Sequence, residues 1–294
     1  MKVAVTGASG LVGSALVPAL REAGHDVVRL VRRPAATGDE LEWHPDTGTI
    51  DVDRLGGVDA VVHLAGETIG QRWSEAARQR ILGSRVDGTG LVARTIASLE
   101  PRPSVFVQAS GVGYYGLGDE PVTEESPKGT GFAADVVEAW ERAAEPARQA
   151  GIRVVALRKA PIVDRREGPV GRMRLPFLLG LGGRVGDGKQ WWNWVSLPDV
   201  VRAYLYALEG ELSGPANVVA GAVPNAVFTK ALGKALHRPT VLPLPAFAVR
   251  LAFGEMGDEL LLGGQRPVAE RLSQAGFAFR DTDLDATLEV ALST

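Results

Sequence analysis

Residues 6–13 read Thr6-Gly7-Ala8-Ser9-Gly10-Leu11-Val12-Gly13, and this stretch decides the fold. It follows a short β-branched run over residues 2–6 and precedes apolar residues at helical spacing over residues 11–23. In such a strand-to-helix loop the glycines permit a tight turn, close approach of a pyrophosphate, and close helix packing. The stretch therefore predicts a dinucleotide-binding loop, with a glycine-rich turn in another kind of α/β protein as the alternative. The predicted cofactor-binding residues in it are Thr6, Gly7, Ser9, Gly10, Leu11, Val12 and Gly13.

Outward from this loop, strand-like and helix-like segments alternate. Further apolar strands are expected over residues 26–31, 59–64, 104–109 and 152–157, with helices over 74–100 and 135–149. Such alternation implies right-handed crossovers and a parallel sheet covered on both faces. We therefore predict an α/β protein, a Rossmann-type doubly wound parallel sheet with a smaller C-terminal substrate lobe.

The pattern changes after about residue 165. Residues 168–188 are rich in Gly, Arg and Pro, a helix capped by Ser196 is expected over residues 197–208, and short helices and prolines follow from about residue 220. The dinucleotide-binding domain is thus predicted to span residues 1–165 and to be completed by about 190–220. The substrate lobe is predicted to comprise residues 166–189 and 221–294.

The composition of the 294 residues narrows the classes of function. The net charge of −3 argues against a generally basic nucleic-acid-binding surface. Cysteine is absent and the four histidines are scattered, so the sequence supports no thiolate or histidine metal site. No apolar stretch reaches the roughly 18 residues of a membrane span, and a cytoplasmic protein without membrane or nucleic-acid partners is expected.

The end of the second strand predicts the nucleotide preference. An NAD site usually has an acidic residue there, which holds the ribose hydroxyls. Here Val31 is followed by Arg32 and Arg33, and an arginine suits the 2′-phosphate of NADP(H). NADP(H) is therefore the predicted cofactor, with NAD(H) less favoured; the alternative is a solvated basic pair.

Several separated motifs resemble the extended short-chain dehydrogenase/reductase superfamily. They are TGASGLVG, the fourth-strand motif His63-Leu64-Ala65-Gly66, the segment SGVGYYG over residues 110–116, and the late segment WVSLPDV over residues 194–200. The chain more closely resembles its atypical branch called epimerase family proteins. HLAGETI over residues 63–69, Gly83-Ser84-Arg85, Trp140-Glu141 and Gly264-Gln265-Arg266 carry that likeness. The resemblance implies an NAD-dependent epimerase/dehydratase domain with a small C-terminal domain of unknown function, and it adds Leu64, Ala65, Gly66 and Arg85 to the predicted cofactor site.

The usual catalytic residues of that superfamily are missing. Ordinary members use a Ser or Thr with a Tyr-x-x-x-Lys pair, in which lysine lowers the pKa of the tyrosine that acts as acid and base. No Tyr-x-x-x-Lys occurs in this chain, and the expected helix reads Phe132-Ala133-Ala134-Asp135-Val136-Val137. The usual Ser/Thr position falls on Gly111, and Ser110 lies one residue early, hence on the opposite face of a strand.

Substitute acids and bases are found at the expected ligand edge of the sheet. The catalytic candidates are Tyr114, Glu67, Ser110 and Lys159. Each has a plainer alternative: packing near the cofactor for Tyr114, a structural contact for Glu67, a turn cap for Ser110 and a surface position for Lys159. Arg85 either reaches an anion or pairs with a carboxylate such as Glu67.

Aromatic and basic residues of the second half are candidates for substrate binding. The predicted substrate residues are Tyr115, Trp191 and Trp192, with a lobe-packing cluster as the alternative for the tryptophans. Arg172, Arg174 and Arg184 are candidates for binding a diphosphate, or else form a solvated basic loop.

Two functions remain open for the protein. One is an NADP(H)-dependent oxidoreductase or epimerase-like enzyme that acts on a carbonyl or sugar-nucleotide-like small molecule, and the other is a non-catalytic NADP(H)-binding regulator or scaffold. A homodimer through the helices over 74–100 and before residue 149 is expected from the superfamily.

Overall fold

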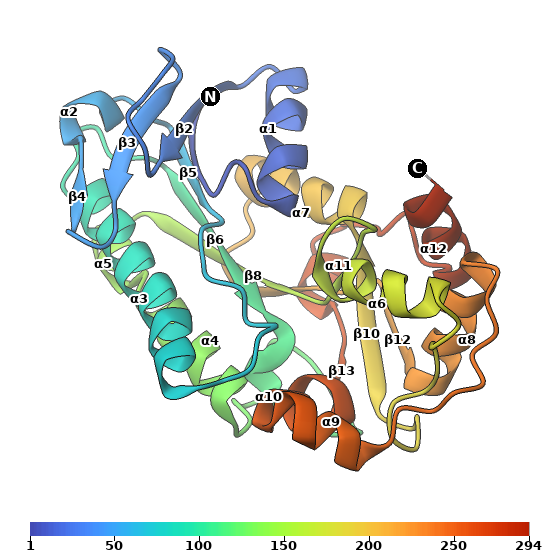
Figure 1. The fold of residues 1–294 in the computed structure, drawn as a ribbon. Helices are drawn as coiled ribbons and strands as arrows, with labels where there is room; N and C mark the ends of the chain where they lie inside the picture. Colours follow the sequence, from blue (N-terminus) through green and yellow to red (C-terminus); the bar gives the residue numbers. More distant parts are fainter. Residues whose placement is uncertain (294) are drawn as a thin grey trace.

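A large, mainly parallel sheet organises the computed structural model, which describes residues 1–293 (Figure 1). Its strand order is β11-β8-β6-β5-β1-β2-β3-β4, and only β4 runs antiparallel to its neighbour. The predicted parallel α/β sheet is thus confirmed. The eight strands are β1 (Lys2–Thr6), β2 (Asp26–Val31), β3 (Glu40–His44), β4 (Thr49–Ile50), β5 (Ala60–His63), β6 (Val105–Gly111), β8 (Arg153–Lys159) and β11 (Gly214–Val218).

The strand order reverses beside β1, and this reversal positions the site. From β1 the chain builds β2 and β3 on one side and then returns to add β5, β6 and β8 on the other. At such a point the connections leave in opposite directions and open a crevice at the carboxyl ends of the strands, where ligands of open α/β sheets bind. The loop after β1 lies at this point.

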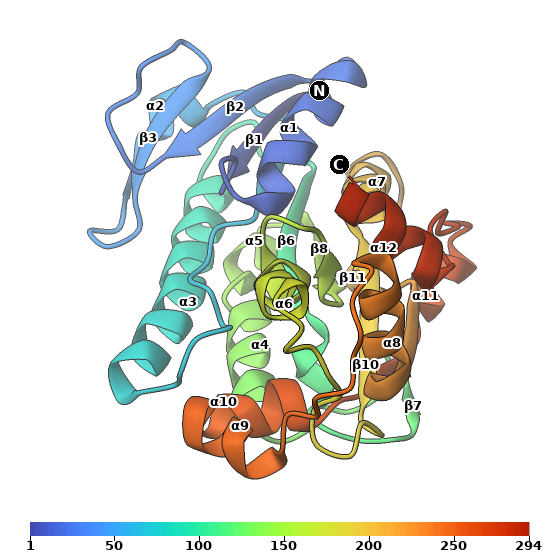
Figure 2. The ribbon, with the colours of Figure 1, turned by 45° about the vertical axis from the view of Figure 1, so that its right-hand side comes forward.

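Helices cover both faces of the sheet because side chains alternate along each strand (Figure 2). On β6, Val105 and Val107 pack with α1 (Leu11–Glu22) and α7 (Leu197–Glu209). Phe106 points the other way, into a core with α3 (Glu75–Ala97) and α5 (Glu145–Gln149). Beside α3 lies α4 (Phe132–Arg142).

The expected elements agree with the structure where the local signals are strong. Strands β1 and β2 have the expected bounds, and Ser196 caps α7 by accepting the Asp199 N–H at 3.1 Å. The expectation of one helix over 135–149 was wrong in detail. The helical segment begins at Phe132 and is divided into α4 and α5, since Pro146 favours the first turn of a new helix. Strands β3 and β4 and the short helix α2 (Val52–Leu55) were not foreseen.

The remaining elements form a smaller region beside the large sheet. Strands β9 (Ile162–Val163), β10 (Trp191–Ser196) and β12 (Gly221–Pro224) make a second sheet, and α8 (Asn225–Ala235) packs against α12 (Leu284–Ser293). The stretch from residue 168 to 188 contains α6 (Gly168–Leu178). The further elements are α9 (Ala246–Phe253), α10 (Glu255–Gly257), a π-helical turn (Asp258–Leu262) and α11 (Glu270–Gln274).

The C-terminal segment also joins the edge of the large sheet. Strand β13 (Arg266–Pro267) pairs with β7 (Pro121–Val122), and α11 packs on β11. Asn217 of β11 donates its side-chain amide to Val268 O at 2.8 Å. The buried Glu124 carboxylate accepts the backbone N–H groups of Asn217 and Arg271 at 2.8 and 3.4 Å. The outermost parallel strand is therefore held by residues from the last tenth of the chain.

Candidate functional site

Two glycines of the loop after β1 are required by the packing of the protein itself. Gly7 has a φ of +67°, and a Cβ there would lie 2.9 Å from the backbone of Leu64 and Ala65. A Cβ on Gly13 would lie 2.2 Å from Gly7 O and 2.6 Å from Ala8 Cα. These contacts bring the turn, the start of α1 and the end of β5 together.

Gly10 differs, because the protein does not need its missing side chain. A Cβ there would meet only Gly7 O, at an ordinary 3.5 Å. Gly10 is the N-cap of α1, no side chain caps the helix, and Ser9 and Gly10 are exposed. Unpaired N–H groups at a helix start with open space before them fit a phosphate. The loop therefore fits the pyrophosphate of a dinucleotide.

Thr6 joins β1 to the end of β5 below this loop. Its hydroxyl lies 2.8 Å from His63 Nδ1 and accepts the N–H groups of Leu64 and Ala65 at 3.1 and 3.3 Å. The side chain is fully buried. The Thr6 hydroxyl thus positions the end of β5, and the prediction that Thr6 also binds cofactor stays a prediction.

The two arginines after β2 have different surroundings. Arg33 donates to both carboxylate oxygens of Glu40, at 2.8 and 2.6 Å. Arg32 is exposed, and its guanidinium makes no hydrogen bond or ion pair within residues 1–293. Only Arg32 is thus free to meet a 2′-phosphate without leaving a partner. The prediction for Arg33 is weakened because Glu40 already balances its charge.

Three charged candidates lie at the carboxyl ends of β5 and β8. Arg85 of α3 lies under Gly66, where a Cβ would be 3.7 Å from Arg85 Cζ. Glu67 accepts from Gln71 Nε2 at 3.1 Å, and its charge raises the pKa of Arg85 while burial lowers that pKa to about 10. No ion pair joins Arg85 and Glu67. Lys159 is half-buried rather than a surface lysine, and it donates to Tyr204 Oη at 3.2 Å and Ser110 O at 3.4 Å.

Ser110 belongs to a different cluster on the α4 side of the sheet. Its hydroxyl donates to Glu141 Oε1 at 2.6 Å, and Arg158 donates to both Glu141 oxygens at 2.8 Å. The pairing residues Glu141 and Arg158 had no predicted role, although both lie in stretches that the sequence singles out. The structure does not favour Ser110 as a catalytic group, because its hydroxyl already donates to Glu141, whose side chain is 13% exposed.

The two tyrosines after β6 have different exposure. Tyr115 is buried, donates to Asn217 Oδ1 at 2.8 Å and accepts from Arg158 at 3.1 Å. Burial is the main cause that raises the pKa of Tyr115. The expectation that Tyr115 binds substrate is therefore corrected to an interior role. Tyr114 is partly exposed, and its ring lies 3.5 Å from Arg158 Cζ. Tyr114 stays a catalytic prediction.

The tryptophans of β10 divide in the same way. Trp192 is buried and stacks on Phe228 with ring centroids 4.4 Å apart, and Trp194 belongs to the same apolar cluster. Trp192 as a substrate residue is therefore corrected to lobe packing. Trp191 is half-buried under the guanidinium of Arg266, 4.7 Å from its ring centre, and stays a prediction.

Among the candidate diphosphate-binding arginines Arg172, Arg174 and Arg184, Arg172 donates to Gly70 O. This bond connects α6 to the loop after β5.

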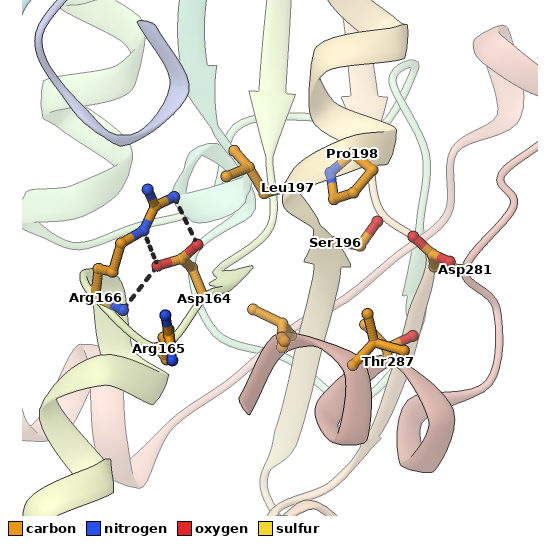
Figure 3. Close-up of a pocket in the computed structure, with 11 residues that line it drawn as sticks. Asp164, Arg165, Arg166, Ser196, Leu197, Pro198, Asp281 and Thr287 are labelled. Carbon is orange, nitrogen blue, oxygen red and sulfur yellow. Dashed lines mark hydrogen bonds and ion pairs between the residues drawn. The ribbon is translucent and has the colours of Figure 1, made fainter. Parts of the chain in front are cut away.

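A separate hollow of about 350 Å³ lies between the end of β9, the start of α7 and α12 (Figure 3). Asp164, Ser196 and Asp281 line it, and Arg166 is held by Asp164 at 2.7 to 3.1 Å. None of the predicted site residues lines this hollow. Within the described residues, no cluster of acidic and histidine side chains could hold a metal ion, and no helix is long and apolar enough to cross a membrane.

Comparison with known proteins shows the family. Residues 3–221 match the model of the NAD dependent epimerase/dehydratase family. The chain belongs to this family. Residues 244–291 match a domain of unknown function, DUF1731, so the resemblance noted in the sequence is confirmed.

Family relatives match over the full chain. An epimerase family protein of Mycobacterium leprae is 44% identical over 98% of this chain and 95% of its own. The epimerase family protein YfhF of Bacillus subtilis is 34% identical over 98% of this chain and 97% of its own.

Solved structures of similar proteins share the fold. The crystal structure of human epimerase family protein SDR39U1 (isoform 2) with NADPH matches with a TM-score of 0.90 and 33% identity, over 100% of this chain and 99% of that one. MoeE5 in complex with UDP-glucuronic acid and NAD matches with a TM-score of 0.79 and 27% identity, over 98% and 96%. These structures confirm the Rossmann-type expectation, and they include both nicotinamide cofactors.

Proposed function

We propose that this protein is an NADP(H)-dependent oxidoreductase or epimerase-like enzyme of the extended short-chain type, acting on a carbonyl or sugar-nucleotide-like small molecule. The observation that carries the proposal is the loop after β1. Gly7 and Gly13 are required by packing, whereas Gly10 leaves open space before uncapped helix N–H groups. The human relative solved with NADPH supports the same cofactor.

The chain's own residues have separate tasks in this proposal. Backbone groups of Gly7, Ser9, Gly10, Leu11 and Val12 hold the pyrophosphate, and Arg32 holds the 2′-phosphate. Leu64, Ala65, Gly66 and Arg85 extend the cofactor site along the end of β5. When bound, the nicotinamide supplies hydride transfer.

Proton transfer falls to residues other than the usual pair. Glu67, Tyr114 and Lys159 lie near the carboxyl edge and have titratable side chains. The smaller lobe is proposed to hold substrate, with Trp191 as one contact. This lobe comprises residues 166–189 and 221–294, and the dinucleotide-binding domain comprises residues 1–165, completed by about 190–220.

The composition of α4 favours a second candidate. Helix α4 has Phe132 and Val136 four residues apart and no Tyr-x-x-x-Lys pair. A protein that binds NADP(H) without catalysis, as a regulator or scaffold, would need neither residue.

The two functions are separated by measuring binding and turnover on the same preparation. Titration calorimetry with NADPH and NADH tests the cofactor, and NADPH oxidation with a panel of carbonyl compounds tests catalysis. If the protein is an enzyme, we expect turnover to fall in the Glu67→Ala or Tyr114→Phe variant. Turnover should not fall in Glu22→Ala, a control at an exposed residue of α1. Tight NADPH binding without turnover on any compound would favour the regulator, and NADH binding more tightly than NADPH would overturn the cofactor preference.

A further inference from the structure

The most exposed apolar side chains of the protein gather in two stretches of the smaller lobe. Within residues 1–293, seven large apolar side chains are more than 60% exposed, and six of them lie in residues 175–181 or 241–251. These six form the apolar patch: Leu175, Leu179, Leu181, Val241, Phe247 and Leu251. Single exposed leucines are ordinary on a protein surface, whereas a group of them marks a surface that binds another apolar surface.

Backbone contacts hold the two stretches side by side. Leu244 donates its N–H to Arg184 O and accepts the N–H of Gly186, both at 2.9 Å. Arg238 Nε donates to Leu178 O, at the end of α6, at 3.0 Å. The chain that leads into α9 therefore runs along the chain that leaves α6.

Helix α9 has one exposed apolar face. Phe247 and Leu251 are four residues apart and hence lie on the same side of the helix, whereas Val249 is fully buried. Helices α6 and α9 lie on the same side of the molecule (Figure 2). The apolar patch thus extends from α6 through the paired stretches to α9.

The surroundings of the apolar patch are basic, although the net charge of the chain is −3. Residues 174–189 and 237–251 contain a single acidic residue, Asp187, and five basic ones: Arg174, Arg184, Lys189, Arg238 and Arg250. The guanidinium groups of Arg174 and Arg184 are exposed and make no hydrogen bond or ion pair within residues 1–293. These two charges are therefore available to an external anion.

The charge argues against a second copy of the chain as the occupant. A two-fold dimer brings the same surface of both copies together, so this patch would bring ten basic and two acidic residues into one interface. Like charges brought together in this way repel each other. A surface that is apolar and negatively charged fits both features, and a bilayer that contains anionic lipids is such a surface.

We propose that the apolar patch binds the surface of an anionic lipid bilayer. Phe247 and Leu251 enter the boundary between headgroups and acyl chains, and Arg174 and Arg184 contact the lipid phosphates. Binding of this kind needs no membrane-spanning helix, and the described residues contain none. The expectation of no membrane partner rested on the missing span, which does not concern a surface that lies on the headgroups.

Sedimentation of the whole chain with lipid vesicles tests the apolar part of the patch. Binding to phosphatidylcholine vesicles with about 30% phosphatidylglycerol is expected to be at least about tenfold tighter than binding to phosphatidylcholine alone. Phe247→Ser combined with Leu251→Ser should weaken binding at least about tenfold. Val52→Ser, a change at an exposed apolar residue of α2, is the matched control and should bind like the unchanged protein.

The same assay tests the charges. Arg174→Gln combined with Arg184→Gln should weaken vesicle binding roughly tenfold, as should raising the salt concentration from about 0.05 to about 0.5 M. Arg94→Gln, a change at an exposed arginine of α3, should leave binding unchanged. The melting temperatures of all variants should match that of the unchanged protein, because every altered side chain is exposed.

A fluorescent label separates insertion from simple charge attraction. The chain has no cysteine, so Leu251→Cys and Val52→Cys each offer one site for an environment-sensitive dye. Vesicles should shift the emission of the Leu251→Cys conjugate to shorter wavelength and leave the other conjugate unchanged. The proposal would be overturned by equal binding to both kinds of vesicle or by equal emission from both conjugates. It would also be overturned by dimerisation through the patch, or by saturable binding of inorganic diphosphate, without vesicle binding.

Discussion

Glu40 holds Arg33 in a two-pronged ion pair, with Arg33 Nη1 and Nη2 at 2.8 and 2.6 Å from the two carboxylate oxygens. The same carboxylate accepts the Ala36 N–H at 2.9 Å, and Arg33 is the main cause that lowers the pKa of Glu40 to about 2. Glu40 of β3 thus neutralises Arg33, one of the two basic residues that follow β2. Arg32 is therefore the residue that we propose discriminates between NADPH and NADH.

Arg32→Gln is therefore expected to weaken NADPH binding while NADH binding changes little. A charge-assisted hydrogen bond to a phosphate contributes about 1.5–3 kcal/mol, so the dissociation constant for NADPH should rise roughly 10- to 100-fold. Calorimetric titration with both nucleotides measures this. Arg33→Gln is the matched control, with a smaller effect on NADPH. Equal losses for both nucleotides in Arg32→Gln would contradict the assignment.

Gly10 and Gly13 are expected to separate cofactor binding from folding. Gly10→Ala places a Cβ in open space, 3.5 Å from Gly7 O, so the melting temperature should stay the same while NADPH binding falls at least about tenfold. Gly13→Ala places a Cβ 2.2 Å from the same oxygen and should destabilise the protein by about 1–3 kcal/mol. Thermal unfolding with and without NADPH measures both. Normal NADPH binding by the Gly10 variant would remove the main support for the cofactor site.

The cluster of Ser110, Glu141 and Arg158 is expected to act on stability. Arg158→Met leaves the largely covered Glu141 carboxylate, 13% exposed, without its cation and should cost about 3 kcal/mol in the free energy of unfolding. Ser110→Ala removes one hydroxyl donor and should cost about 1–2 kcal/mol. Urea unfolding measures both, and NADPH binding by the folded protein should be unchanged. A Ser110 variant that loses turnover at unchanged stability would restore the serine as a catalytic group.

His63 is expected to make the protein sensitive to mild acid. Complete burial lowers the pKa of His63 to about 3, whereas an unfolded histidine titrates near 6.5. The unfolded state therefore binds more protons than the native state between these values, and stability falls as pH drops through that window. The contribution lost between neutral pH and pH 5 is about 2 kcal/mol.

Denaturant unfolding at several pH values checks this. His63→Gln should show a shallower loss of stability below pH 6.5, whatever its stability at pH 8. His237→Gln, a change at an exposed histidine, should retain the slope of the unchanged protein. Parallel curves for all three proteins would show that His63 does not titrate as its burial requires.

Elements set by interactions between residues close in sequence were predicted correctly, whereas elements that depend on residues far apart in sequence were not. The strand over residues 2–6 and the loop after it are set by local apolar pattern and glycine spacing, and both were predicted. Strand β3 was not predicted although ELEWH alternates charged and apolar residues as strands do, since the run is short and the burial of Glu40 depends on an arginine from outside the strand.

The site was predicted less completely, because it depends on contacts between distant parts of the chain. Trp192 resembles a pocket residue until Phe228 is placed against it. Lys159 fits a surface position in the sequence, and only the folded structure shows its ammonium bonded to Tyr204 of α7 and to the Ser110 carbonyl. Sequence pattern identified the ligand edge but not which of its polar groups are already satisfied.

The hydrogen bonds of Glu124 and Asn217 limit how this family can be recombined. The Asn217 side chain of β11 donates to Val268 O, and Glu124 accepts the backbone N–H groups of both Asn217 and Arg271. The segment that matches a separate family model thus packs directly against the edge of the large sheet. A chimaera that takes residues 244–291 from a relative would have to reproduce these backbone positions, or Glu124 would lose a donor within the protein interior. We therefore expect truncation before residue 244 to expose this sheet edge and to destabilise the remaining protein.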